Sequence, residues 1–468
     1  MKNKKPIHIL RYGTVAEKKH LSNAISSYDY LSINGNTAAY VSNAIAKFIV
    51  EKFFSKPQKG YFIDPITYAF QYKIDLLQNK SENGETKLKK SIKKLIEAYG
   101  YPASKVENGK PICIEDFNNE TKKEFCNNVL KFQYNLVYEH ITNNDLQKYL
   151  EYIAPENVTG LPQLRPKFLI SPYFYLDTDK EEYRVWLNLN IELLDLAVEE
   201  AEREFDGVDV FGQIVLSKSV LSNTEAIDLI TKKYGEVNCA GYTIWIDDLD
   251  EHRASKKELE GLMRILEKLK GDNHKPIYNM YGGYFSILLA HKDIQLLSGV
   301  SHGLEYGEYR KVYPVGGGVP VSKYYYFPLH KRLDFTDAFY LLKHANIIDV
   351  NKQDWGNTTR YIDEICDCKM CKEILHEKMI NFIEFESREY YDVKRKTSTL
   401  RRKKASAETK RNCLYHYLLC KEKEFHLLKE ELGKLLKDLK SERDLYSSCK
   451  FVNSDDYKYI DVWCELLK

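Results

Sequence analysis

Stretches typical of β-strands alternate with stretches typical of amphipathic helices over most of this chain of 468 residues. This alternation is the pattern of repeated strand–helix units, which bury a parallel sheet beneath helices. About eight such units within the first 350 or so residues predict an α/β fold, a (β/α)8 barrel of the TIM type with insertions. A doubly wound open sheet has the same alternation and stands as the alternative, because strand number alone does not decide closure. The predicted strands are 7–12, 28–33, 61–66, 167–176, 213–217, 242–247, 276–280, 299–306 and 323–328, and the predicted helices are 85–99, 182–205, 224–234, 255–270 and 336–345.

We divide the chain into two parts. Residues 1–350 form the barrel, interrupted by a helical insertion near 100–165, and residues 351–468 form a helical subdomain. In the second part we predict helices over 372–391 and 409–445. Charged residues mark a solvated face on the later helix; they are Glu424, Glu430, Lys434 and Lys437.

Composition restricts the compartment and the partners. The net charge is only +2, so affinity for nucleic acid would have to come from a local patch. The basic N-terminus lacks the apolar core of a signal peptide, and no run approaches the roughly 18 apolar residues of a membrane span. We therefore expect a cytoplasmic protein without a membrane partner. The 36 tyrosines fit either a coding bias or surfaces on which flat groups stack.

Three of the ten cysteines, Cys366, Cys368 and Cys371, fall within six residues. Thiolates at this spacing can converge on one tetrahedral ion, and sulfur ligands favour zinc or an iron–sulfur cluster. We favour His416 as the fourth ligand, with His376 and Cys413 as rivals. Three cysteines and one histidine would fill the coordination of zinc and leave no position for a catalytic water, which predicts a structural Zn²⁺.

Polar residues at the ends of the predicted strands are the candidates for a site, because barrels place functional side chains there. Asp247, Asp248 and Asp250 follow one strand, and such carboxylates can act as nucleophile, base or cation ligand. An acidic loop before the helix at 255 is the plain alternative. Further candidates at strand ends are Asp64, Gly282, His302, Glu305 and Arg310.

Residues 394–411 hold nine basic residues against one acid, Glu408. A solvated charge run is the plain interpretation, but contact with phosphates is the natural use of such a patch in a near-neutral chain. The candidates for nucleic-acid contact are Lys394, Arg395, Lys396, Arg401, Arg402, Lys403 and Lys404.

The cysteine triplet after the last barrel strand, with a histidine on a later helix, resembles the tRNA-guanine transglycosylase superfamily. This superfamily includes queuine and archaeosine enzymes that act on tRNA, and relatives that insert 7-deazaguanines into DNA. Residues 61–71, Tyr-Phe-Ile-Asp-Pro-Ile-Thr-Tyr-Ala-Phe-Gln, resemble the family strand that ends in Asp-Ser-Gly-Gly-Phe-Gln. Gly282 and Gly283 resemble the glycine pair that lets the family's backbone approach the base. Residues 299–305, Gly-Val-Ser-His-Gly-Leu-Glu, occupy the place of the family's Gly-Val-Asp-Met-Phe-Asp strand, which carries the nucleophile.

The resemblance implies base exchange, in which an aspartate attacks the sugar C1′, guanine leaves and a modified base replaces it. Asp64 would contact the base, one of Asp247, Asp248 and Asp250 would recognise it or attack C1′, and His302 or Glu305 would assist. Zinc and the basic stretch would dock the tRNA or DNA.

The absence of an aspartate from residues 299–305 supports a second hypothesis: an inactive barrel that binds nucleic acid as a subunit of a modification or phage-defence complex. A hydrolase that cleaves the glycosidic bond without reinserting a base is a third. A homodimer and a larger complex both stay open.

Overall fold

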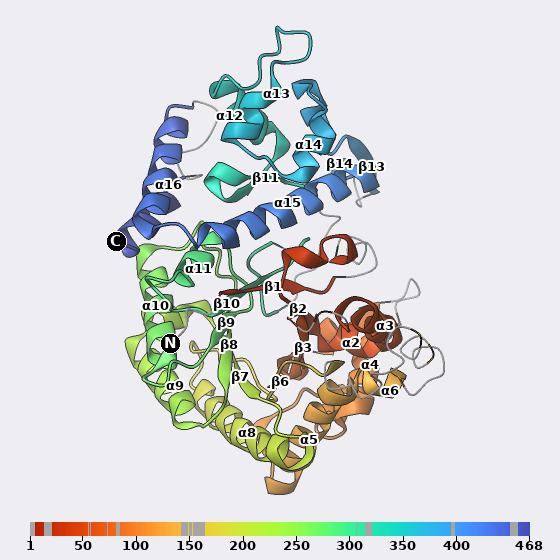
Figure 1. Ribbon diagram of the computed structural model, residues 1–468. Helices are drawn as coiled ribbons and strands as arrows, with labels where there is room; N and C mark the ends of the chain where they lie inside the picture. Colours follow the sequence, from red (N-terminus) through yellow and green to blue (C-terminus); the bar gives the residue numbers. More distant parts are fainter. Residues whose placement is uncertain are drawn as a thin grey trace.

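Eight parallel strands form the wall of a nearly closed barrel (Figure 1). The computed structural model describes residues 5–13, 21–54, 56, 58–72, 74–80, 85–141, 148, 152, 164–305, 307–313, 321–394, 398–449 and 457–468. The barrel strands are β1 (Ile7–Arg11), β2 (Tyr30–Asn34), β3 (Gly60–Asp64), β6 (Leu169–Ile170), β7 (Val210–Leu216), β8 (Gly241–Ile246), β9 (Ile277–Asn279) and β10 (Gly299–His302).

The strand order identifies the fold. It runs β3-β2-β1-β10-β9-β8-β7-β6, so β1 lies beside both the second strand and the last. Barrel strands that follow one another in the sequence therefore lie side by side, as in a chain that passes once around a barrel. In a doubly wound sheet the strand order instead reverses at a switch point. The two remaining edges, β3 and β6, meet where the Lys167 N–H donates to the Tyr61 carbonyl at 2.8 Å. The predicted TIM-type arrangement therefore fits, and the open-sheet alternative does not.

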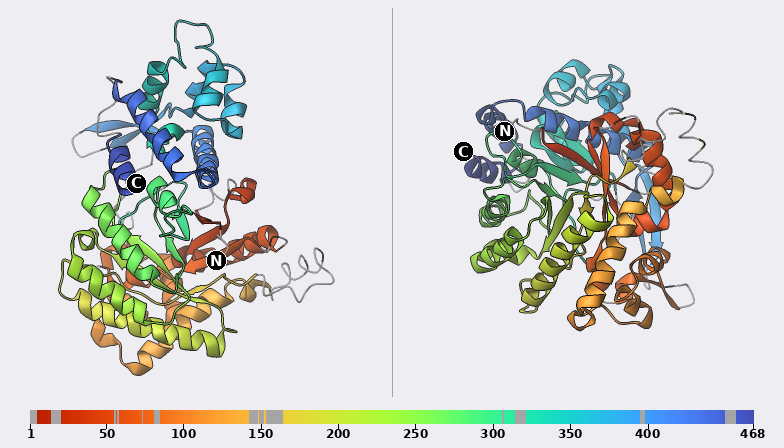
Figure 2. Two further views of the ribbon diagram at one scale, coloured as in Figure 1. Left: turned by 60° about the vertical axis from the view of Figure 1, so that its left-hand side comes forward. Right: turned by 60° about the horizontal axis from the view of Figure 1, so that its bottom comes forward.

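Helices surround the strands (Figure 2). Each predicted helix of the barrel layer has a counterpart within a few residues, although the one expected from residue 85 begins only after a short strand. The outer helices are α2 (Gly35–Tyr40), α3 (Ser42–Phe53), α4 (Lys90–Tyr99), α5 (Asn119–Asn135), α6 (Tyr138–Ile141), α8 (Tyr183–Glu204), α9 (Thr224–Glu236), α10 (Lys256–Lys270) and α11 (Tyr284–Leu289); the short strands β4 (Gln78–Lys80) and β5 (Thr86–Leu88) pair as a hairpin.

Helix α10 illustrates how the sequence builds this layer. Ser255 accepts a hydrogen bond from the Glu258 N–H and Glu258 accepts one from the Ser255 N–H, which caps the helix. Leucines and isoleucines at helical spacing then face the barrel and are buried. Gly261 lets the helix pack directly on the backbone of Leu221.

The C-terminal region is largely helical and carries two hairpins. Its elements are β11 (Tyr324–Tyr326), β12 (Lys331–Leu333), α12 (Phe335–His344), α13 (Thr358–Glu364), α14 (Lys369–Leu375), β13 (Glu389–Lys394), β14 (Thr399–Lys404), α15 (Ala407–Leu427), α16 (Leu432–Ser447) and α17 (Tyr459–Leu466). Helix α15 runs between the barrel and the rest of this region (Figure 1). Phe425 on it stacks on His8 of β1, with ring centroids 4.4 Å apart.

Three predicted elements of the C-terminal half, and one predicted solvent-exposed residue, are wrong. Segment 323–328 pairs as the antiparallel hairpin β11–β12 and is not a barrel strand. The helix expected over 372–391 ends at Leu375, where His376 and Glu377 take left-handed conformations; a 3-10 helix and β13 follow. The helix expected over 409–445 is divided into α15 and α16. Glu424 is fully buried and marks no solvated face, because α15 is covered on two sides.

Among the helices in the described ranges, none is both long and apolar enough to cross a membrane.

We expect Gly261→Ala to lower the free energy of unfolding by about 1–3 kcal/mol, since overpacked sites cost that much. Its Cβ would overlap the Leu221 carbonyl oxygen, which is backbone and cannot rotate away. Gly235→Ala in α9 is the matched control, because nothing lies within 4 Å of its Cβ position; it should stabilise by up to about 1 kcal/mol. Urea denaturation measures both, and equal effects would contradict the tight α10 contact.

Candidate functional site

Asp64 lies at the carboxyl end of β3 and is only 4% exposed. Its Oδ1 accepts hydrogen bonds from the Tyr173 hydroxyl at 2.5 Å and from the Ile66 N–H at 3.0 Å. Burial raises the pKa of Asp64 above its ordinary value, while these two hydrogen bonds act against the rise. The predicted base-contacting carboxylate is therefore buried at the barrel mouth, meaning the carboxyl ends of the barrel strands.

Two arginines meet at the same mouth. The Arg11 guanidinium lies 4.2 Å from the centre of the Tyr281 ring and donates to Asn34 at 3.3 Å. Arg310 donates to the Tyr281 hydroxyl at 3.0 Å. Both arginines are close enough to lower the pKa of Asp64 electrostatically. The mouth thus combines one buried carboxyl group with two guanidinium groups, which suit anionic or hydrogen-bonding ligands.

Aromatic rings fill the space around these charges. The Trp245 ring is 4.7 Å from that of Tyr281 and 5.5 Å from that of Tyr68. Rings of this kind can stack on nucleic-acid bases, and these three are at most 7% exposed in this structure. The cluster comprises Tyr68, Tyr72, Tyr173, Tyr175, Trp245, Tyr281 and Tyr313.

The three aspartates after β8 point in different directions. Asp247 faces the mouth, where it accepts hydrogen bonds from the Val312 N–H at 2.7 Å and the Tyr175 hydroxyl at 3.3 Å; burial raises its pKa. Asp248 pairs with Lys311 at 3.5 Å. Asp250 instead accepts a hydrogen bond from the His252 N–H at 3.1 Å. Only Asp247 joins the groups at the mouth.

His302 and Glu305 also lie away from Asp64. The His302 ring is fully buried beneath α15, with its Nε2 2.7 Å from the Nε2 of His8. Burial, together with His8, lowers the pKa of His302 well below its ordinary value, so the ring stays neutral. Glu305 forms an ion pair with Lys410 of α15. Side chains alternate along a strand, so the buried Ser301 faces the barrel interior instead.

Gly282 and Gly283 allow close packing. A Cβ on Gly282 would lie 2.6 Å from Val300, and one on Gly283 would lie 2.6 Å from the Glu308 carboxylate and 2.8 Å from that of Glu251. Burial raises the pKa of Glu251, and Glu308 acts in the same direction. The space beside Gly283 is therefore filled by two carboxyl groups rather than open to a base.

A network of buried charges joins Glu308 to α15. The ammonium of Lys421, fully buried, lies 2.5 Å from Glu308 and 2.7 Å from Glu424. His330 Nδ1 lies 2.7 Å from Glu424. Sequence reasoning missed this network, although Lys421 and Glu424 stand three residues apart on one helix, a spacing at which opposite charges pair.

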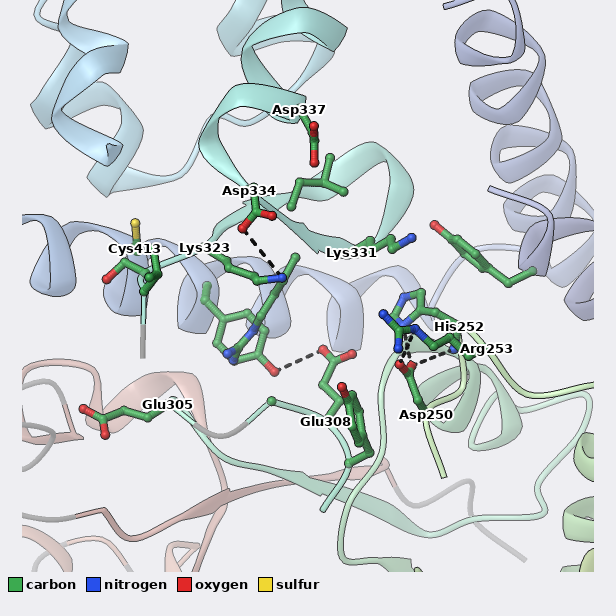
Figure 3. Close-up of a pocket in the computed structure, with 18 of the residues that line it drawn as sticks. Asp250, His252, Arg253, Glu305, Glu308, Lys323, Lys331, Asp334, Asp337 and Cys413 are labelled. Carbon is green, nitrogen blue, oxygen red and sulfur yellow. Dashed lines mark hydrogen bonds and ion pairs between the residues drawn. The ribbon is translucent and has the colours of Figure 1, made fainter. Parts of the chain in front are cut away.

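A pocket of about 1060 Å³ lies between the barrel and the C-terminal region (Figure 3). Asp250, Glu305 and Glu308 line it on the barrel side. Its charges largely pair with one another: Asp250 with Arg253 at 3.5 Å, and Lys323 with Asp334 at 3.7 Å. Because these charged groups already pair with one another, we favour the mouth over this pocket as the candidate reaction site.

Cys366, Cys368, Cys371 and His416 form a buried cluster that could bind a metal ion. Their donor atoms all lie within 4.8 Å of one another. His416 Nδ1 is 3.3 Å from the Sγ atoms of Cys368 and Cys371, close to the S–N edge of about 3.6 Å expected for tetrahedral zinc. His416 Nε2 lies 2.8 Å from the Tyr325 carbonyl oxygen, a partner that orients a metal-binding ring.

The rivals of His416 lie outside the cluster. His376 is exposed at the end of α14, and Cys413 donates to the Phe385 carbonyl. Sequence reasoning missed Cys420, one turn after His416, whose Sγ is 3.7 Å from that of Cys366 and from His416 Nδ1. The spacing of four residues on one helix was the available signal.

The basic stretch forms a hairpin. Arg401, Arg402, Lys403 and Lys404 lie on β14, and Lys394 ends β13. Arg395 and Lys396 lie outside the described residues.

No protein-family model matches the chain, and no curated protein matches it.

We expect one metal ion per chain in the purified protein, measured by elemental analysis. Cys368→Ala and His416→Ala should each reduce this content to near zero, because a tetrahedral site loses most of its affinity with one ligand. Cys113→Ser, on a cysteine of the barrel's outer layer, should keep the metal. If the Cys368→Ala and His416→Ala variants both kept the metal, the proposed ligand set would be wrong.

We expect Asp64→Asn to raise the free energy of unfolding at pH 7 by about 1 kcal/mol. The pKa of Asp64 is raised in the folded state, so its charged form costs stability at neutral pH. The gain should shrink as the pH falls through that raised pKa and the wild-type carboxyl takes up its proton.

Asp206→Asn is the control of opposite sign for this experiment. Hydrogen bonds from Tyr134 and Arg165 lower the pKa of Asp206, so this variant should lose stability at neutral pH and recover relative to wild type in acid. The same sign for both variants would contradict the burial of the Asp64 charge.

Proposed function

We propose that this chain is a transglycosylase-like enzyme that exchanges a guanine-type base in tRNA or DNA at the barrel mouth. The observation that carries the proposal is the group of Asp64, Arg11 and Arg310 among aromatic rings at the carboxyl ends of the strands, with Asp247 on the same rim beside Tyr175 and Val312. Stacking surfaces, hydrogen-bonding charges and two carboxyl groups are the parts that base recognition and glycosidic chemistry require.

The two aspartates take different roles. Asp247 attacks C1′ of the nucleotide, and the C1′–N bond breaks with its electron pair going to the base. Asp64, a buried carboxyl group whose pKa burial raises, is the general acid and supplies the proton that the leaving base takes up. The incoming base then attacks C1′, loses its proton to Asp64 and releases the Asp247 carboxylate.

Zinc is the metal we assign to the cysteine cluster. Three thiolates and one imidazole nitrogen, all buried, match its preferred donors and leave no open position. The metal stabilises the fold of the C-terminal region.

Strand β10 favours the alternative, a barrel that binds nucleic acid without exchanging bases. Its inward-facing residue near the mouth is Ser301, where the resembled family carries its nucleophile, and the neighbouring His302 is packed under α15. This alternative predicts binding without turnover.

Incorporation of radiolabelled guanine into total tRNA and into duplex DNA tests the proposal. Asp247→Asn should reduce incorporation by about 1,000-fold or more, since an activated nucleophile carries most of the rate. Asp250→Asn is the matched control, because Asp250 faces the other pocket, and should keep near wild-type activity. Binding of nucleic acid with no incorporation by the wild type would support the inactive alternative and overturn the enzyme.

A further inference from the structure

The hairpin of β13 and β14, which we call the basic ribbon, stands free of the core. None of its residues from Glu389 to Lys394 or from Thr399 to Lys404 is buried. The ribbon lies at the side of the C-terminal region, next to the start of α15 (Figure 1). A two-stranded ribbon without a buried face is marginally stable on its own. We therefore ask which partner could bind the exposed ribbon.

Basic side chains occupy both faces of the ribbon. Directly paired residues share a face, and the pairs Tyr390–Lys403 and Asp392–Arg401 therefore define one face. The pairs Tyr391–Arg402 and Glu389–Lys404 define the other. The second face also carries the apolar pair Val393–Leu400. Basic side chains that can contact phosphates therefore stand on both faces.

The charges on the ribbon are unbalanced. Its described residues include five bases, Lys394, Arg401, Arg402, Lys403 and Lys404, against the two acids Glu389 and Asp392. Lys404 pairs with Glu389 at 3.4 Å, and Lys403 reaches Glu386, before the ribbon, at 3.1 Å. Arg401 stacks 4.8 Å from the centre of the Tyr390 ring. The net positive charge on this arm is large for a chain whose total is +2.

The root of the ribbon is tied to the loop after β10. Two residues after β14, Ser406 caps α15 by accepting the Thr409 N–H. One turn later, Lys410 forms an ion pair with Glu305, three residues after the end of β10. Arg310 of the mouth belongs to the same loop. Through Lys410, the ribbon is therefore fastened to the loop that also supplies Arg310 to the mouth.

We propose that the basic ribbon enters the major groove of a B-form duplex, and that the substrate is double-stranded DNA. This inference rests on the proposed function in taking the mouth as the place where the base reacts. The B-DNA major groove is about 12 Å wide and admits a two-stranded ribbon, whereas the A-form RNA groove is too deep and narrow. Six residues per strand give the ribbon a length of about 20 Å, and its two basic faces then meet phosphates on both walls of the groove.

Fluorescence anisotropy with labelled duplexes of one sequence, made as DNA and as RNA, tests the inference. The wild type should bind the DNA duplex at least 10-fold more tightly. Arg401→Ala/Arg402→Ala should weaken DNA binding about 10-fold and reduce the salt dependence by about two released ions, because each phosphate contact releases about one. A major-groove ligand, methyl green, should compete, and the minor-groove ligand netropsin should not.

The matched control is Lys429→Ala/Lys437→Ala, which removes two exposed charges at and before α16, on the opposite side of the C-terminal region from the ribbon (Figure 1). It should leave DNA affinity unchanged. Because the ribbon has no buried residue, its variant should fold, and an unchanged metal content checks this. Equal or tighter binding of the RNA duplex, or DNA binding insensitive to Arg401→Ala/Arg402→Ala, overturns the inference.

Guanine incorporation in the same preparations separates the two proposals. Incorporation into tRNA, together with DNA binding that ignores the ribbon, keeps the enzyme and overturns the ribbon inference. Ribbon-dependent DNA binding, with no incorporation into any nucleic acid, keeps the ribbon inference and overturns the enzyme.

Discussion

The packing of the C-terminal region against the barrel depends on the ammonium group of Lys421, which is completely buried. An unpaired charge in that position would be costly, so Glu308 from the loop after β10 and Glu424 from α15 must both be in place. His330, beside the hairpin β11–β12, binds the same Glu424. Loss of the Lys421 ammonium would leave two buried carboxylates without their cation, and this cost holds α15 in position against the barrel.

Helix α15, held in this position, contacts both the barrel and the rest of the C-terminal region. Its first turn directly follows the basic ribbon in the sequence, and its middle contributes His416 to the cysteine cluster. Its later turns pack on β1 and contact the loop before β2. A helix covered on two sides cannot keep the simple division into apolar and polar faces. That is why its sequence reads as charged although many of its residues are buried.

The features that sequence predicted best were those encoded locally or repeated. The strand–helix alternation predicted the barrel, and the cysteine spacing together with His416 predicted the metal cluster. Tyr324, Tyr325 and Tyr326 read as a buried barrel strand because an apolar run does not reveal its partner strand. Glu424 was predicted to be exposed because the periodicity of a helix sequence does not show how many neighbouring elements cover the helix. Within the site, Asp64 lies near Arg310, and Asp247 lies at the end of another strand of the same rim. The directions of Asp250 and His302 depend on loop and helix packing that no local pattern encodes.

The seam of the barrel, between β3 and β6, has a meaning beyond closure. At one end it is joined by the backbone bond from Lys167 to Tyr61, and at the other by the hydroxyl of Tyr173 on the carboxylate of Asp64. The Thr67 hydroxyl adds to this second connection, because it donates to the Tyr173 carbonyl and accepts from the Tyr173 N–H at 2.8 Å. If a ligand displaced the Tyr173 hydroxyl from Asp64, the seam would lose one of its contacts, so binding at the mouth and the strength of the barrel wall are coupled at this bond.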